Sequence, residues 1–196
     1  MMGVIDQGEL SVLMTADTIQ SRVRELAVEI DGWDAGDHEL HVVGVLKGGV
    51  VFLSDLIRAL SRPVTLDFVA MSSYGNETEP FSEPRLTKTL DEGIEDRDVL
   101  VVEDIVDTGG TLSWLLKYIE TRRPRSLRSV ALLDKPARRQ VDVRVDLVGF
   151  RIQDHFVVGY GLDFAERYRH LPYLGVLEPG GTRTEDDAFV TTLDAE

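Results

Sequence analysis

Residues 98–114 read DVLVVEDIVDTGGTLSW, and this stretch decides the fold. The apolar run at 99–102 predicts a buried strand, and helical spacing of apolar residues resumes after the turn. Between strand and helix lie three carboxylates, Glu103, Asp104 and Asp107, followed by Thr-Gly-Gly-Thr. Open α/β sheets bind ligands beyond the carboxyl ends of their strands. We therefore expect a binding site at this turn. The apolar helix positions are Leu112, Leu115, Leu116 and Ile119.

The rest of the chain alternates in the same way between apolar strands and amphipathic helices. A helix is predicted around 19–30, with Asp17 or Thr18 as its N-cap, and another over 50–60. This alternation is typical of a mostly parallel sheet covered on both faces, so the predicted class is α/β. The polar stretch 72–95 predicts a lid loop or a weak hairpin. The expected strands are 40–46, 64–71, 98–102, 127–133, 145–150, 156–160 and 173–177.

The composition favours one domain that functions in water. The chain has 196 residues, a net charge of −14 and no cysteine, which excludes disulfides and thiolate metal sites. The acidic balance argues against a nucleic-acid partner, because that requires a basic surface. The sequence shows neither a membrane-spanning run nor a signal pattern, so we expect a cytoplasmic protein with no membrane partner. One domain is predicted over 1–178, and an acidic, disordered tail over 179–196.

The turn at 108–111 predicts a phosphate site. Thr108, Gly109, Gly110 and Thr111 offer backbone N–H groups and two hydroxyls at a helix N-terminus, which attracts anions. Neither GxxxxGK nor GxGxxG is present, so a nucleoside triphosphate or a dinucleotide is poorly supported. The nearby carboxylates suit a sugar phosphate, because they accept hydrogen bonds from vicinal hydroxyls and can hold Mg²⁺. A short acidic motif is more often a solvated turn, but the strand–loop–helix context favours a site.

The segment VVEDIVDTGGTL resembles the phosphoribosyl-diphosphate (PRPP) motif of the type I phosphoribosyltransferases. Further segments resemble the bacterial hypoxanthine(-guanine) members of that family, in family order over about 10–178. The resemblance implies the type I phosphoribosyltransferase fold, with a small hood and a mobile lid. It also implies transfer of 5-phosphoribose from PRPP to N9 of a 6-oxopurine, with release of pyrophosphate. The segments are VGVLKGGVVFLSDL, MSSYG, LLDKPARR, DLVGF and FVVGYGLDFAERYRHLPYLGVL.

The resemblance assigns roles around the acidic turn. Glu103 and Asp104 match acids that face the ribose hydroxyls and the metal, and the turn 108–111 matches the 5′-phosphate loop. Asp107 matches the proposed general base at purine N7, which makes it the catalytic candidate. Adjacent carboxylates raise one another's pKa, and this suits acid–base chemistry.

Residues that would meet pyrophosphate come from two other segments. Lys47 and Gly48 match the pyrophosphate loop, where the family often has a non-proline cis peptide. Arg169 matches an arginine that contacts pyrophosphate, and Asp163 matches a ligand of a second Mg²⁺. Alone, these residues are typical of a helix-entry turn, a surface charge and a polar turn. Their assignment therefore depends on the resemblance.

The purine side of the expected site also comes from the resemblance. Lys135 matches the residue that reads purine O6, and an ammonium donor there favours hypoxanthine and guanine over adenine. Phe156 matches the aromatic ring that stacks on the base, and Val157 the backbone contact to its edge. Pattern alone would place Phe156 and Val157 in the core and Lys135 in an exposed loop.

The expected lid begins at Ser73 and Tyr74, which match residues that close over the transition state and exclude water. The sequence departs from the family after this point, where NETEPFSEPRLTKTL contains two prolines and three glutamates. A second departure precedes Phe156, where Ile152-Gln153 replaces the Ile-Pro of the family.

Two alternatives stay open on sequence grounds. A PRPP-sensing regulatory protein of the same fold would need a basic surface, which this acidic chain does not offer. A sister enzyme would use xanthine or another nucleobase, although Lys135 favours 6-oxopurines. The resemblance implies PRPP and a purine base as partners, Mg²⁺ as cofactor, and a homodimer or homotetramer.

Overall fold

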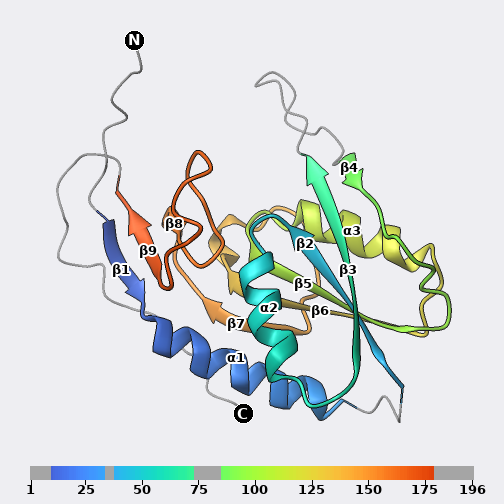
Figure 1. Ribbon diagram of the computed structural model, residues 1–196. Coiled ribbons are helices and arrows are strands. Elements are labelled where there is room, and N and C mark those ends of the chain that lie inside the picture. The colour runs from blue at the N-terminus through green and yellow to red at the C-terminus, as the bar shows by residue number, and fades with distance from the viewer. Residues whose placement is uncertain (1–9, 34–37, 73–84, 179–196) are drawn as a thin grey trace.

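The computed structural model describes residues 10–33, 38–72 and 85–178, in which strands and helices alternate along the chain (Figure 1). The main sheet has the strand order β4-β3-β2-β5-β6-β7, and each neighbouring pair is parallel except β3 and β4. The predicted α/β class with a mostly parallel sheet is confirmed. The strand bounds are β2 Leu40–Leu46, β3 Val64–Ser72, β4 Arg85–Lys88, β5 Asp98–Val106, β6 Ser126–Asp134 and β7 Leu147–Arg151.

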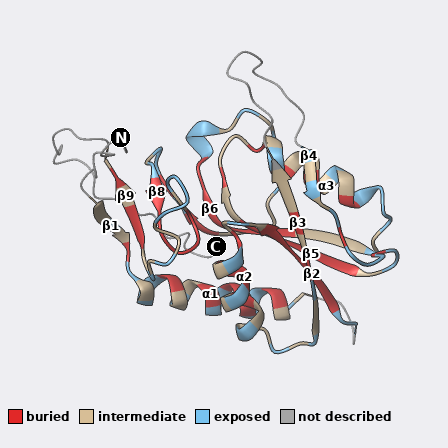
Figure 2. Cartoon of the chain, turned by 45° about the horizontal axis from the view of Figure 1, so that its top comes forward, coloured by how far each residue is buried: buried red, intermediate tan, exposed pale blue. Residues whose placement is uncertain are grey.

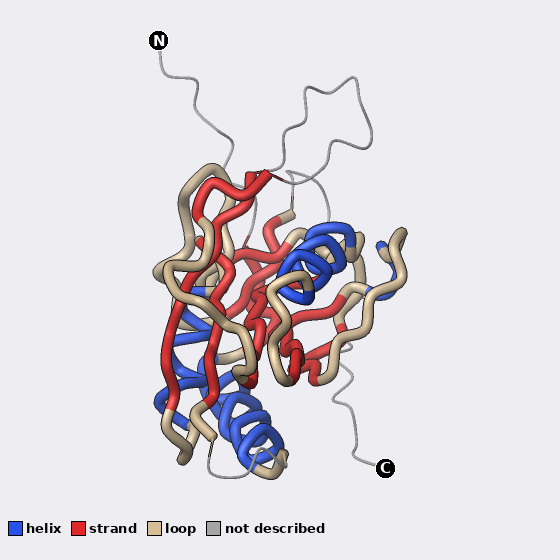
Figure 3. The backbone as a smooth tube through the Cα atoms, turned by 90° about the vertical axis from the view of Figure 1, so that its right-hand side faces the viewer, coloured by secondary structure: helices blue, strands red, loops and turns tan. Residues whose placement is uncertain are grey.

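Helices cover both faces of this sheet. The helices α1 (Ala16–Asp31) and α2 (Val50–Ala59) pack on one face, and α3 (Gly110–Glu120) packs on the other (Figure 3). Each face has its own cluster of buried apolar side chains. Strands β2, β5 and β6 lie between the two clusters and are mostly buried, as the red ribbon in Figure 2 shows. Burial on both faces explains why these strands are apolar without interruption.

The first helix confirms the predicted apolar spacing and corrects its start. The buried face of α1 consists of the expected residues, Ile19 to Ile30 at helical spacing. Its N-cap is Thr15, however, and not Asp17 or Thr18. The Thr15 hydroxyl accepts a hydrogen bond from the Thr18 N–H at 3.3 Å. Thr18 therefore lies inside the first turn of the helix, and its N–H is one of the free donors that the N-cap residue satisfies. None of the described helices is both long enough and apolar enough to cross a membrane.

Strand β5 continues beyond its apolar run. The predicted strand ended at 102, but Glu103, Ile105 and Val106 still pair with β6 in parallel register. The backbone ladder, and not the apolar character of the side chains, therefore sets the end of this strand. As a result, both acids of the Glu103-Asp104 pair are carried on a rigid strand instead of a loop.

A smaller antiparallel sheet stands beside the main one, with the strand order β1-β9-β8. It combines β1 (Leu10–Met14), which the sequence analysis did not predict, with β8 (Val157–Val158) and β9 (Leu174–Leu177). The strands expected over 156–160 and 173–177 are therefore shorter and belong to this second sheet. Figure 1 shows it at the left of the molecule, where it provides the expected hood.

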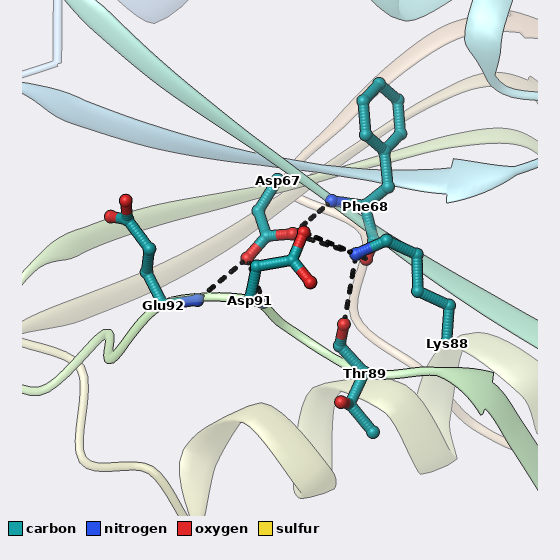
Figure 4. Close-up of polar contacts among 6 residues, drawn as sticks. All are labelled: Asp67, Phe68, Lys88, Thr89, Asp91 and Glu92. Atoms are coloured by element: carbon teal, nitrogen blue, oxygen red, sulfur yellow. Dashed lines mark hydrogen bonds and ion pairs between the residues drawn. The ribbon is translucent and has the colours of Figure 1, made fainter.

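Asp67 fastens the chain that follows β4 onto β3 (Figure 4). Its carboxylate accepts hydrogen bonds from the N–H groups of Phe68 at 2.6 Å and Asp91 at 2.7 Å, and it pairs with Lys88 at 3.3 Å. Burial raises the pKa of Asp67, but these donors outweigh burial and lower it overall. The antiparallel pairing of β3 with β4 confirms the hairpin within the polar stretch 72–95. The residues between the two strands lie outside the described part.

Candidate active site

The carboxyl end of β5 and the start of α3 form a pocket of about 120 Å³. Its lining includes the predicted acids Glu103, Asp104 and Asp107, together with most of the predicted phosphate turn. The strand places Glu103 in the interior, 8% exposed, and Asp107 at the mouth of the pocket with its side chain 41% exposed. The sequence-predicted turn and acids thus share one pocket. The pocket is lined by residues 103–109, Thr111 and Leu112.

The two adjacent acids have unusual electrostatics. Burial, and then the neighbouring Asp104 carboxylate, raise the pKa of Glu103 well above its ordinary value. Burial likewise raises the pKa of Asp104, although its Oδ1 accepts a hydrogen bond from the Ile105 N–H at 2.8 Å. Glu103 Oε2 is buried without a hydrogen-bond partner among the described residues. A buried, unsatisfied carboxylate oxygen costs free energy. A hydrogen-bond donor or a cation bound by this acid pair would offset that cost.

The phosphate turn is shaped by one glycine and by the segment that follows β6. Gly109 has a φ of 84°, a conformation that L side chains rarely adopt, and a Cβ there would lie 2.6 Å from the Val141 carbonyl oxygen. The Thr108 carbonyl accepts hydrogen bonds from the N–H groups of Gln140 and Val141, each at 3.0 Å. The N-terminus of α3 has no side-chain cap. Its N–H groups are therefore suited to an anion.

The turn after β2 meets the acids directly. The Leu46–Lys47 peptide bond is cis, as the resemblance predicted. A Cβ on Gly48 would lie 1.5 Å from Asp104 Oδ2, so no other residue fits here without displacing the acid. A Cβ on Gly161 would lie 2.2 Å from the Gly48 carbonyl oxygen, which shows how closely the loop 159–169 approaches this turn.

The loop 159–169 brings Asp163 and Arg169 together, and both were predicted. Arg169 Nη2 lies 2.7 Å from Asp163 Oδ1, and its Nη1 donates to the Gly161 carbonyl at 2.8 Å. Glu166, which the sequence analysis missed, lies between the predicted cations: both its oxygens are 3.1 Å from Lys47 Nζ, and Oε2 is 3.4 Å from Arg169 Nη2. The hydrogen bond from Lys47 lowers the pKa of Glu166.

A backbone hydrogen bond fixes Lys135 beside the end of β5. The Lys135 N–H donates to the Val106 carbonyl at 2.9 Å, and its Nζ donates to the His155 carbonyl at 2.5 Å. Lys135 is 7% exposed, in contrast to the exposed loop that pattern alone favoured.

Phe156 is 50% exposed and packs edge-on against Phe164, with ring centroids 5.5 Å apart. Its ring is thus available to a ligand, whereas Val157 is buried in β8.

Arg138 is a second residue that the sequence analysis missed. It ends a short 3-10 helix, η1 (Pro136–Arg138), that follows Lys135. Its Nε donates to Asp107 Oδ1 at 2.8 Å, and its Nη1 donates to Asp154 Oδ2 at 3.4 Å. The hydrogen bond to Asp107 raises the pKa of Arg138. Its segment LLDKPARR carries the family resemblance, but nothing in the spacing indicates a contact between Arg138 and Asp107.

The predicted metal ligands do not form a single cluster, and the predicted lid and tail lie outside the described residues. Among the described residues, no group of three or more His, Asp or Glu side chains could hold a metal ion, so Asp163 does not join Glu103 and Asp104 in one cluster. The predicted lid residues Ser73 and Tyr74 and the predicted tail 179–196 lie outside the described residues.

Comparison with known proteins gives the same family by two routes. A model of the phosphoribosyl transferase domain matches residues 15–165. The hypoxanthine-guanine phosphoribosyltransferase of Bacillus subtilis is 46% identical over 168 residues, which cover 86% of this chain and 93% of the relative. The protein of the same name from Mycobacterium avium is 50% identical over 174 residues and covers 86% of both chains.

Solved structures agree with the sequence comparison. A hypoxanthine-guanine phosphoribosyltransferase from Bacillus anthracis has a TM-score of 0.81 at 43% identity, covering 86% of this chain and 98% of the other. A hypoxanthine phosphoribosyltransferase from Staphylococcus aureus has a TM-score of 0.83 at 42% identity, covering 91% and 97%. The described fold, the acidic PRPP-type motif and these matches agree, and the chain belongs to the phosphoribosyltransferase family.

Proposed function

We propose that the protein is a purine salvage enzyme that transfers 5-phosphoribose from PRPP to N9 of hypoxanthine or guanine. The products are IMP or GMP and pyrophosphate. The names of the relatives at 46% and 50% identity support this activity. One observation carries it for this chain: an acid pair, a glycine phosphate turn and a buried lysine meet at the carboxyl ends of β5 and β6.

The acidic end of β5 would bind the ribose phosphate. The N–H groups and hydroxyls of the turn 108–111 suit the 5′-phosphate, because the α3 N-terminus carries positive partial charge. The Glu103 and Asp104 oxygens suit the ribose hydroxyls, which supply the donors that Glu103 Oε2 lacks. Positive charge develops on the ribose as its bond to diphosphate breaks. Nearby carboxylates stabilise that charge in a site that excludes water.

The same acids fit Mg²⁺ as a cofactor. This ion prefers oxygen ligands and is usually held by one or two carboxylates together with substrate phosphates and waters, so a preformed cluster of three acids is not required. Glu103 and Asp104 would hold one ion, and Asp163 would hold a second ion near pyrophosphate. When bound, Mg²⁺ would neutralise negative charge on the diphosphate. The unpartnered Glu103 oxygen supports this fit.

The purine would lie between Lys135 and Phe156. The Lys135 ammonium donates to O6 of a 6-oxopurine, whereas the amino group of adenine would present donors to a donor. The half-exposed Phe156 ring stacks on the base, and the Val157 backbone contacts its edge. Asp107 accepts the purine proton at N7 as general base. Its position on the rim of the pocket, directly after β5, suits this role.

Pyrophosphate would leave along the turn after β2. Two loops that approach closely would contribute Lys47, the Gly48 backbone and Arg169. The positive charges of Lys47 and Arg169 match the leaving diphosphate. Ser73 and Tyr74 would begin the lid over this reaction. The proposal also includes a single catalytic domain over 1–178, a cytoplasmic location, and a homodimer or homotetramer, as the family resemblance implies.

A purine panel tests the proposal. The purified protein is incubated with PRPP, Mg²⁺ and each of hypoxanthine, guanine, xanthine and adenine, and nucleotide formation is followed by absorbance. We expect hypoxanthine and guanine to react and adenine not to react. No nucleotide from any 6-oxopurine would refute the enzyme assignment, and xanthine as the preferred base would support the sister activity.

The variant Asp107→Asn adds a test of the general base. We expect kcat to fall by roughly 10²- to 10⁴-fold, the range typical of general-base catalysis, while the affinity for PRPP stays close to that of the parent. Asp142→Asn is the matched control, since Asp142 is exposed and lies outside the pocket. Parent-like turnover of Asp107→Asn would remove Asp107 from the mechanism.

A further inference from the structure

Arg138 lies between two carboxylates that come from separate segments of the chain. Asp107 directly follows β5, and Asp154 lies in the segment between β7 and β8. The guanidinium reaches both, through Nε to Asp107 at 2.8 Å and through Nη1 to Asp154 at 3.4 Å. A guanidinium carries several donors in one rigid plane, so a single arginine can fix two carboxylates relative to each other.

The chain of contacts continues to the residue proposed to read the base. Asp154 Oδ1 lies 3.7 Å from Lys135 Nζ, and Lys135 Nζ donates to the neighbouring His155 carbonyl. Charges therefore alternate in sign from Asp107 through Arg138 and Asp154 to Lys135. Displacing any member changes the field and the hydrogen-bond geometry at the next one.

We propose that Arg138 is a positioning residue that holds Asp107 and Lys135 in one geometry for the purine. Arg138 donates to Oδ1 of Asp107. In the described part of the chain no hydrogen bond is made to Oδ2 of Asp107, so this oxygen can accept the proton of the purine. Through Asp154, Arg138 restrains the Lys135 ammonium. This inference rests on the proposed function, in which Asp107 and Lys135 contact the two edges of the same purine.

The exposure of these side chains argues that the contact does not serve stability. Arg138, Asp107 and Asp154 are 45%, 41% and 50% exposed, and ion pairs in such positions add little to folding. The neighbouring Arg139 serves the fold instead, because it pairs with the buried Asp134 and packs against Gly109. Two adjacent arginines thus have separate tasks.

Steady-state kinetics of Arg138→Gln test the inference. We expect kcat/KM for hypoxanthine to fall roughly 10- to 100-fold, since small misplacements of positioning groups have effects of this order. The KM for PRPP should stay within about threefold, because the phosphate turn and acid pair are held by other contacts. The midpoint of thermal unfolding should match the parent. Arg138→Lys should recover part of the loss, as an ammonium can pair with Asp107 but lacks the fork for two carboxylates.

A matched control and a double-mutant cycle sharpen this test. Arg144→Gln removes another Arg–Asp pair that lies outside the pocket, between the exposed Arg144 and the largely buried Asp146 at 2.8 Å, and it should leave the kinetics unchanged. Asp154→Asn should also lower kcat/KM for hypoxanthine. If Arg138 acts through Asp154, the double variant should lose less than the product of the two single losses.

Two outcomes overturn the inference. If Arg138→Gln keeps the parent's kcat/KM for hypoxanthine, the contacts of Arg138 with Asp107 and Asp154 do not contribute to purine positioning. Equal losses toward PRPP and hypoxanthine, with no rescue by lysine, would show a general disturbance instead of purine positioning. Because each comparison starts from an active parent, its failure differs from failure of the proposed function, in which the parent itself forms no nucleotide.

Discussion

Strand β5 carries carboxylates at both ends, and the two ends are built in opposite ways. At its start, Asp98 accepts hydrogen bonds from Arg125 Nε at 3.0 Å, Arg125 Nη2 at 2.5 Å and Ser126 Oγ at 2.6 Å. At its other end, Glu103 has a buried oxygen without a partner among the described residues. Hydrogen bonding from Arg125 lowers the pKa of Asp98, whereas burial and the Asp104 carboxylate raise the pKa of Glu103.

The difference separates residues that stabilise the fold from residues that serve a ligand. A buried carboxylate with full partners favours folding, as Asp98 does and as Asp67 does on β3. A buried carboxylate without partners opposes folding, and such groups are typical of positions that bind a ligand. The predictions below test this contrast between a structural end and a functional end of β5.

The largest effect is expected from Gly48→Ala at the functional end. The new methyl group would lie 1.5 Å from Asp104 Oδ2 and must displace the acid or the turn. We expect kcat/KM to fall by about 100-fold or more, because a displacement of about 1 Å in a catalytic group has that effect. The free energy of unfolding should fall by about 1–3 kcal/mol, as in other overpacked sites.

The control for this variant comes from the turn that leads to the structural end. A Cβ on Gly93 would meet no atom within 4 Å, so Gly93→Ala should leave both activity and stability unchanged. Parent-like activity of Gly48→Ala would show that the close approach of the turn to Asp104 is not needed.

The sequence predicted most of this arrangement, because apolar runs mark buried strands and helical spacing marks the covering helices. It misplaced the end of β5, since the charged pair at 103 and 104 suggested that the strand had stopped although its ladder with β6 continues. It missed β1, whose partner β9 lies at the far end of the chain. Local patterns carry no information about such distant pairing.

The candidate site shows the same limit. The PRPP-type motif named the acids and the turn, because they are contiguous in sequence. Arg138 and Glu166 were missed because their roles arise from contacts with residues 31 and 119 positions away. Pattern alone places Lys135 in an exposed loop. In the structure its N–H donates to the Val106 carbonyl directly after the β5–β6 ladder, and this contact between distant segments holds Lys135 in a buried position.

Glu103→Gln should separate stability from activity. Loss of the charged acceptor for ribose should lower kcat/KM for PRPP by roughly 10- to 100-fold, the value of a hydrogen bond to a charged group. The free energy of unfolding should equal or exceed that of the parent. The raised pKa means that the parent's contribution from Glu103 is complete below about pH 4.3 and is lost as pH rises through the folded-state value.

Unfolding in denaturant at several pH values measures this effect. The stability of Glu103→Gln relative to the parent should grow as pH rises from about 4 to neutrality. A clear loss of stability at pH 7 would contradict the assignment of Glu103 to the functional end.

Asp98→Asn should show the reverse at the structural end. We expect a loss of about 1–3 kcal/mol in the free energy of unfolding, with unchanged kinetics, because the charged hydrogen bonds to Arg125 and Ser126 are weakened. The lowered pKa of Asp98 gives a contribution that is present above about pH 3.9 and is lost as pH falls through the folded-state value. The gap between parent and variant should therefore close in acid. Asp142→Asn, at an exposed site, is the control.

The smallest effect is expected from Glu166→Gln, which extends the contrast to the cations. Unlike the acid pair, Lys47 and Arg169 already have a partner, because Glu166 lies within 3.1 Å of Lys47 and 3.4 Å of Arg169. If pyrophosphate uses these cations, it must replace an exposed carboxylate that is weakly held. Removing its charge should tighten the binding of inorganic pyrophosphate, measured as product inhibition, by about two- to fivefold. Glu25→Gln is the control, since Glu25 is an exposed partner of the largely buried Arg22, and it should leave pyrophosphate binding unchanged. Weaker pyrophosphate binding in Glu166→Gln would mean that Glu166 orients Lys47 for the ligand instead of competing with it.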